Sequence, residues 1–241
     1  HGESASADMT AVNDGRTEVQ PVLDGYNPVD VYSMDEAGLF YCLGPSAALS
    51  TNEVRGTKIS KERILQLLFS PAISGKKFNL SIYFTYAGGS KAWMTSKEFQ
   101  IWLSDVDHQM QLQEHKIVLL VDNAPSHQVG ELELRNVTIH YLPLNTTSHI
   151  QPMDTGIIKD FKLHYTKQLV QLYINCAEEN KAQTVDLQQA LQFVERAWDS
   201  VCLTTTVNCW QHVNTMATTV SNAERASEKE KDVALAQLAE L

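Results

Sequence analysis

Three aspartates occur at the ends or junctions of predicted elements, where carboxylates from separate parts of a chain can meet. Asp35 follows an alternating segment, Asp122 ends the apolar run "IVLLV", and Asp154 lies 32 residues later at a junction between a loop and a helix. Oxygen ligands of this kind suit the hard cations Mg²⁺ and Mn²⁺. Two such ions about 4 Å apart would activate a nucleophilic oxygen and stabilise a leaving oxygen in phosphoryl transfer. The three aspartates are therefore our candidates for an all-carboxylate metal site.

Each candidate also has a simpler interpretation. Asp122 suits the capping of the turn "APS" that follows it, and Asp154 suits the N-cap of a helix. Glu36 could be an ordinary solvated side chain, and His127 could close a turn. The cluster "NTTS" at 145–148 could bind substrate phosphates or could simply be a loop. The residues alone leave these alternatives open.

Hydrophobic periodicity predicts the elements that must position these side chains. We expect one strand from residue 29 to about Asp35 and Glu36, and another at 64–69, although its period would also fit a helical turn. The segment 78–89 is predicted to pair with it as a hairpin through "SGKK". Strands follow at 117–121 and 137–141, the second with Val137, Ile139 and Tyr141 on one face. Helices are expected from residues 95–96 to 113, from 154 to 176 after the loop "TTSHIQPMDTG", from Asp186, and in the tail from 221.

Composition limits the class of protein. The net charge of −10 and the pI of about 5.2 oppose a general electrostatic attraction to nucleic acid. The chain has no apolar run near the roughly 20 residues that a membrane helix needs, so we expect no membrane partner. Four widely spread cysteines indicate neither a disulfide framework nor a zinc site. The chain starts at His1 without a methionine, so we take it as an excised fragment.

Several segments together resemble one known family. They are "MDEAGLFY", "SKERI", "KAWMTSKEFQIWL", "LLVDNAPSH", "LPLNTTSHIQPMDTGIIKDFKLHY" and "VNCWQH". In this order they resemble the DDE endonuclease domain of pogo/Tigger-type transposases, the Tc1/mariner relatives that also gave rise to centromere protein B. The resemblance extends from residue 25 to residue 215.

This resemblance implies an α/β, RNase H-like fold with a central mixed sheet flanked by helices. Carried over residue by residue, the family's three aspartates correspond to Asp35 of "MDEAG", Asp122 of "VDNAPSH" and Asp154 of "QPMDTG". In the family such residues bind two Mg²⁺ or Mn²⁺ ions. With these ions the enzymes cut transposon ends and join the freed 3′-hydroxyl to target DNA. DNA is thus the expected partner and the nucleus the expected compartment, while homodimer formation is left open.

The resemblance also divides the chain and adds further candidates. Residues 1–28 are expected to be a linker or N-terminal arm after a helix-turn-helix region that this sequence does not include, 29–175 the catalytic core, and 176–241 a helical extension. Candidates for support of the metal ligands or for DNA contact are Glu36, Asn123, His127, Asn145, Thr146 and Gln151.

Some positions depart from the family pattern. Ala37 replaces a usual threonine, and the segment around residues 86–91 is shorter than in relatives, so we expect a shortened edge hairpin and weaker DNA contact. The alternative function is a domesticated transposase core that serves as a DNA- or chromatin-binding scaffold without catalysis. A third interpretation is a nuclease that acts on RNA or on RNA–DNA hybrids, which the motifs favour less because they are those of DNA transposases. Three mutually repelling carboxylates favour the enzyme, because a scaffold has no need of them.

Overall fold

The computed structural model describes residues 9–42, 63–72, 84–87, 94–144, 146–181 and 184–213. The turn of the predicted hairpin, the candidate Asn145 and the predicted tail helix from residue 221 lie outside these ranges.

The described strands form one five-stranded mixed sheet in the order β3-β2-β1-β4-β5. The β1–β2 and β2–β3 pairs are antiparallel, whereas β1–β4 and β4–β5 are parallel. The bounds are Val31–Phe40 for β1, Arg63–Pro71 for β2, Phe84–Ala87 for β3, Ile117–Val121 for β4 and Val137–Tyr141 for β5. The strand interpretation of 64–69 and the pairing of this segment with the next one are confirmed.

The central position of β4 explains its composition. All five of its residues are buried, as expected for a strand covered on both faces. The start of β5 is fixed by Asp107, whose Oδ1 accepts the backbone N–H groups of Arg135, Asn136 and Val137 at 3.0, 2.7 and 2.9 Å. The two parallel strands therefore reach the same edge of the sheet in a defined register.

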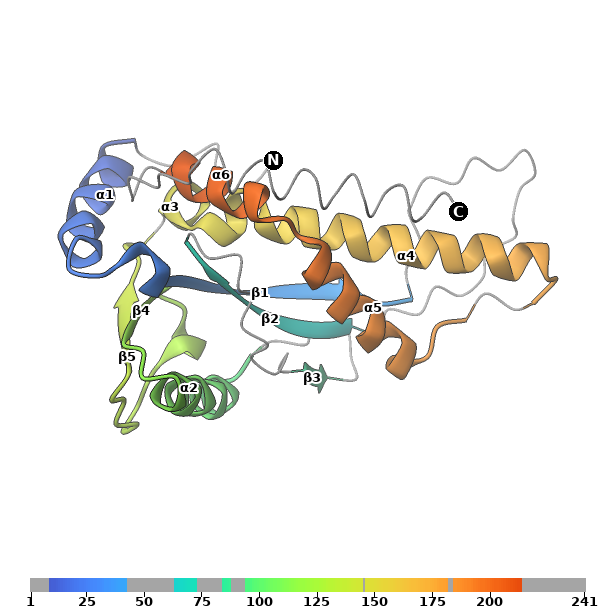
Figure 1. Cartoon of the computed structure of the whole chain (residues 1–241), viewed down its shortest axis with the longest axis horizontal. Coiled ribbons are helices and arrows are strands. Elements are labelled where there is room, and N and C mark those ends of the chain that lie inside the picture. The colour runs from blue at the N-terminus through green and yellow to red at the C-terminus, as the bar shows by residue number, and fades with distance from the viewer. Residues whose placement is uncertain are drawn as a thin grey trace.

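Helices cover both faces of the sheet (Figure 1). On one face lies α2 (Ser96–Leu112), which begins at a capping box between Thr95 and Glu98. Its predicted inner face is confirmed, because the following residues are all buried: Phe99, Trp102, Leu103, Val106 and Met110. On the other face lie α4 (Ile158–Glu178) and α5 (Leu187–Ser200), followed by α6 (Leu203–Val213). Asp186 is the N-cap of α5, as predicted, and accepts a hydrogen bond from the backbone of Gln189 at 2.7 Å.

Part of the segment that we expected to be a linker or N-terminal arm forms a helix that the sequence pattern did not predict. Residues Met9–Leu23 form a helix, α1, and its residues Val12, Val19 and Leu23 are buried in one cluster with Trp210 of α6. A Cβ at Gly15 would lie 3.3 Å from Pro143, so α1 approaches the loop after β5 closely. Three buried apolar residues, at spacings of seven and four, were too few to reveal this period in a polar segment.

Two boundaries that bear on the site were also wrong. The first strand does not end near Asp35 but continues to Phe40, because its second half pairs with β2. The segment expected to be a loop contains the short helix α3 (Thr147–Ile150) and a π-helical turn (Met153–Ile157) that runs directly into α4. Within the described residues, no helix has both the length and the apolar character that a membrane span requires.

Candidate active site

Asp35 and Asp122 lie at the same level on neighbouring parallel strands. The last recorded pair between β1 and β4 joins Ser33 to Leu120. Two residues further along each segment are Asp35 and Asp122, just beyond the point where β1 and β4 separate. Divergence of strands at a carboxyl edge is a usual position for ligand-binding side chains in α/β sheets.

The side chain of Asp122 makes two contacts, and both use Oδ1. This oxygen accepts the backbone N–H of Ala124 at 3.3 Å, and it is paired with Nδ1 of His127. The first contact is the turn cap that we considered as the simpler role. The turn and the histidine together hold a carboxylate whose side chain remains 30% exposed.

His127 is the most constrained polar residue of the site. It ends a 3₁₀ turn (Pro125–His127), it is completely buried, and its Nε2 lies 3.1 Å from Oε1 of Glu36. Burial lowers the pKa of His127, but hydrogen bonds to Asp122 and Glu36 and their negative charge outweigh burial and raise the pKa to about 10. The ring therefore stays protonated at neutral pH between two carboxylates.

Asp35 has an environment that opposes its ionisation. Burial and then the negative charge of Asp154 and Glu36 raise the pKa of Asp35 to about 9, against a hydrogen bond from the backbone N–H of Glu36. The charge of Asp122 adds a smaller increase. Carboxylates whose negative charges meet in this way are what a divalent cation would neutralise. The donor set thus fits Mg²⁺ or Mn²⁺ chemically.

Asp154 lies within the π-helical turn, not at a helix N-cap as its simpler interpretation required. The cap position belongs to Pro152, and Asp154 itself is exposed. The turn is attached to β1 by the buried side chain of Gln151, which donates a hydrogen bond to the carbonyl of Met34 at 3.0 Å. Met34, which precedes Asp35, and Gln151, which lies three residues before Asp154, are therefore directly linked. π-Helical turns are frequent at functional sites.

In the structure the three carboxylates are not arranged as a complete metal site. Among the residues that the structure describes, no three His, Cys, Asp or Glu side chains are arranged so that they could hold a metal ion. Asp35 and Asp154 are close enough to influence one another electrostatically, and Asp122 is turned towards His127.

The other predicted candidates are dispersed. Asn123 is exposed beside Asp122, whereas Thr146 is buried and donates a hydrogen bond to the carbonyl of Pro143 at 2.6 Å. Gln151 is 1% exposed and acts in the link to β1 described above. The sequence reasoning missed Tyr141 as a support for the site, although its hydroxyl donates to the carbonyl of His127 at 2.7 Å.

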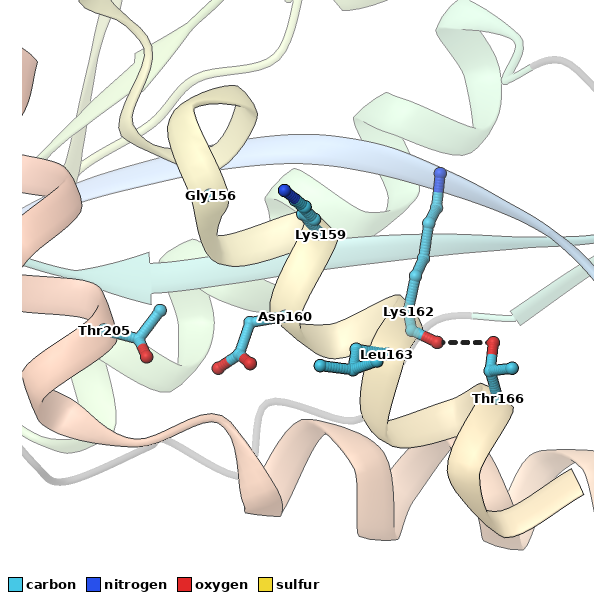
Figure 2. Close-up of a pocket in the computed structure, with 7 residues that line it drawn as sticks. All are labelled: Gly156, Lys159, Asp160, Lys162, Leu163, Thr166 and Thr205. Atoms are coloured by element: carbon cyan, nitrogen blue, oxygen red, sulfur yellow. Dashed lines mark hydrogen bonds between the residues drawn. The ribbon is translucent and has the colours of Figure 1, made fainter. Parts of the chain in front are cut away.

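A shallow hollow of about 400 Å³ lies between α4 and α6, away from the Asp122–His127 pair. Figure 2 shows Asp160 and Leu163 pointing towards Thr205, while the amino groups of Lys159 and Lys162 reach upward in the view, away from Thr205. Gly156, two residues after Asp154, completes one side of the hollow. A Cβ at Gly156 would lie only 2.9 Å from Sγ of Cys209, so α6 packs directly on the turn that contains Asp154.

The arrangement of the elements has counterparts among solved structures. A Mos1 transposase paired-end complex with the left transposon end aligns with 86% of this chain and 60% of its own, with a TM-score of 0.50 and 12% identity. A Mos1 mariner paired-end complex with Mn aligns with 86% of this chain and 59% of its own, also with a TM-score of 0.50, at 14% identity. At these identities the likeness establishes the fold, which is RNase H-like, as the resemblance implied.

Sequence comparison identifies the family. Residues 55–210 match the family described as DDE superfamily endonuclease, which covers more than half of the chain. The chain belongs to this family and is of the pogo/Tigger type within it. The matched segment includes Asp122 and Asp154, whereas Asp35 precedes it.

Three relatives illustrate this relationship. Tigger transposable element-derived protein 4 of Mus musculus is 25% identical over 78% of this chain, and CENP-B homolog protein 2 of Schizosaccharomyces pombe is 23% identical over 82%. Major centromere autoantigen B of Homo sapiens is 26% identical over 76% of the chain. The chain spans 40%, 44% and 33% of the lengths of these relatives, respectively.

Proposed function

We propose that this chain is the catalytic domain of a metal-dependent DNA endonuclease that cuts transposon ends and joins the 3′-hydroxyl to target DNA. The observation that supports the proposal most is the common level of Asp35 and Asp122 on β1 and β4, with the charge of Asp154 acting on Asp35. Family membership makes DNA the substrate and the nucleus the compartment that we propose. Pairing of two copies on two transposon ends is part of the same proposal.

In this proposal Asp35, Asp122 and Asp154 would hold two Mg²⁺ or Mn²⁺ ions. When bound, such ions polarise a phosphodiester and lower the pKa of a water nucleophile. The chain's own contribution is to keep three like charges within reach of one another. Gln151 attaches the turn of Asp154 to β1, and His127 holds Asp122 beside β4. Conversion of Asp35 to its charged form requires loss of the proton that burial and neighbouring charge retain.

Nicking of supercoiled plasmid DNA in Mn²⁺ tests the proposal. Wild-type protein should convert the plasmid to the open form, and Asp122→Asn should reduce the rate more than about 100-fold, because a ligating charge contributes several kcal/mol to transition-state stabilisation. Asp160→Asn is the matched control, since Asp160 is an acid of the neighbouring α4 that lines the hollow instead. Nicking by Asp122→Asn at the wild-type rate would refute the metal role.

A second candidate function is a DNA- or chromatin-binding scaffold derived from a transposase. Two observations favour it. Asp154 is exposed, and the described acidic side chains are not arranged as a complete metal site. DNA retention in a gel-shift assay, with no nicking in Mn²⁺ or Mg²⁺ and no effect of Asp122→Asn on retention, would support this second function over the first.

A further inference from the structure

Glu36, His127 and Asp122 form a hydrogen-bond network that joins two neighbouring strands. Glu36 belongs to β1 and Asp122 follows β4, and each faces one ring nitrogen of the same histidine. Alternation along β1 turns Glu36 towards the face covered by α2, whereas Asp35 faces the opposite side with Ala37 and Leu39. The side chain of Glu36 therefore contacts His127 and points to the face opposite that of the Asp35 side chain.

The histidine cannot reorient easily within this network. Its backbone N–H donates to the carbonyl of Ala124 at 3.0 Å, and its carbonyl accepts the hydroxyl of Tyr141 at 2.7 Å. The ring centroid lies 5.0 Å from that of Phe99 in α2, and the side chain is fully buried. With both nitrogens directed at carboxylate oxygens, the ring has one orientation that satisfies them.

The effect of the network falls on one oxygen of Asp122. The backbone N–H of Ala124 and Nδ1 of His127 both contact Oδ1. The turn and the histidine therefore fix the orientation of the carboxylate. We propose that Glu36 and His127 are positioning residues that orient Asp122 for a divalent cation, with Glu36 holding the ring and the ring holding the carboxylate. This inference rests on the proposed function. Hydrogen-bonded partners of metal ligands usually contribute a factor of about 10–100 to affinity.

A purely structural role would be the alternative, because buried histidines also stabilise turns. The chain offers a matched comparison in the pair formed by His115 and Asp30, whose Nδ1 and Oδ1 atoms lie 2.8 Å apart. There the histidine is 45% exposed and lies outside the network. His127 differs in that it contacts two acids, one of which is a predicted ligand of the family site.

The test is a measurement of Mn²⁺ binding, monitored through the decrease in the electron paramagnetic resonance signal of the free ion. His127→Leu removes both contacts and should weaken Mn²⁺ binding about 10–100-fold. His127→Asn keeps an amide N–H near the former Nδ1 and should recover part of the affinity, although it fills the core less well. Glu36→Gln should weaken binding to a smaller extent, and His115→Gln should leave it unchanged.

Melting temperatures without metal separate folding from positioning. Recovery of Mn²⁺ affinity in His127→Asn without recovery of stability is the result expected for a positioning residue. Wild-type affinity in both His127→Leu and Glu36→Gln, with binding lost in Asp122→Asn, would overturn the inference and leave the proposed function intact. If His127→Leu does not fold, Glu36→Gln alone decides. An absence of Mn²⁺ binding by the wild type would overturn both.

Discussion

At the residue scale, burial and the neighbouring acids oppose the negative charge of Asp35. Its pKa is raised to about 9 from an ordinary value of 3.8, first by burial and then by the acids around it. In the unfolded chain the same carboxyl ionises near 3.8, so the folded state binds a proton that the unfolded state has released. The contribution of Asp35 to stability is full below pH 3.8 and is lost progressively as pH rises through about 9.

Replacement of Asp35 by Asn should therefore raise the stability of the metal-free protein. The amide keeps the shape but has no proton to lose, so the variant should melt about 2–6 °C above the wild type near pH 8, with a smaller difference near pH 5. Differential scanning calorimetry in a chelator would measure this. An Asp35→Asn protein that melts below the wild type at pH 8 would show that the carboxyl is not under electrostatic strain.

At the element scale, the π-helical turn Met153–Ile157 depends on helix α6. The close approach of Cys209 to Gly156 leaves no room for a side chain, because an added Cβ would lie 2.9 Å from the sulfur. Cys209 is itself buried, and burial raises the pKa of its thiol to about 11, so at neutral pH it packs as a small neutral group. The position of Asp154 is thus set by a residue that lies far from it in the sequence.

Gly156→Ala should displace this turn. We expect a loss of about 1–3 kcal/mol of unfolding free energy, as in other overpacked cores, together with weaker metal binding. In the Cys209→Ala background the sulfur is absent, so adding Gly156→Ala should reduce the unfolding free energy much less than it does in the wild type. Urea unfolding of the four proteins gives the coupling. Strict additivity of the two changes would contradict direct contact.

The elements themselves were largely predictable, and the reasons are local. The period of 95–113 matches a helix, and the run at 117–121 is too short for a typical helix and contains three β-branched residues, which favours a strand. By contrast, the continuation of β1 past Asp35 depends on pairing with β2, and the π-helical turn depends on packing against Cys209. Tertiary contacts of this kind leave no periodic signal near the residues that they affect.

The candidate site was predictable to a similar extent. The three aspartates and His127 could be named from the motifs, but the connection of His127 to Glu36 spans 91 residues. Alternation in "MDEAGLF" does place Asp35 and Glu36 on opposite faces, and that signal could have separated their roles. The support from Tyr141 follows only from the register of β4 and β5.

At the scale of the whole molecule, the two ends of the described chain meet over one face of the sheet (Figure 1). Buried residues of α1 share a cluster with Trp210 of α6, and Nε of Arg16 donates to the carbonyl of Val213 at 2.9 Å. Since α6 also packs on the turn of Asp154, the N-terminal helix supports the site indirectly.

Leu23→Ala should therefore destabilise the entire domain and not only the N-terminal segment. Leu23 is 2% exposed within this cluster, and buried Leu→Ala changes cost about 2–5 kcal/mol. Leu112→Ala is the control, because Leu112 is 65% exposed. Chemical denaturation followed by tryptophan fluorescence would compare them. Equal stability of Leu23→Ala and Leu112→Ala would mean that α1 is not part of the cooperative fold.

The most direct test of the account is a calorimetric titration of the metal-free protein with Mn²⁺ and with Mg²⁺, with wild type, Asp122→Asn and Asp160→Asn side by side. We predict saturable binding by the wild type and by Asp160→Asn, and a loss of binding in Asp122→Asn, because Asp122 belongs to the proposed ligand set and Asp160 does not. Equal binding by all three proteins, or none by the wild type at millimolar metal, would contradict a metal centre at Asp35, Asp122 and Asp154.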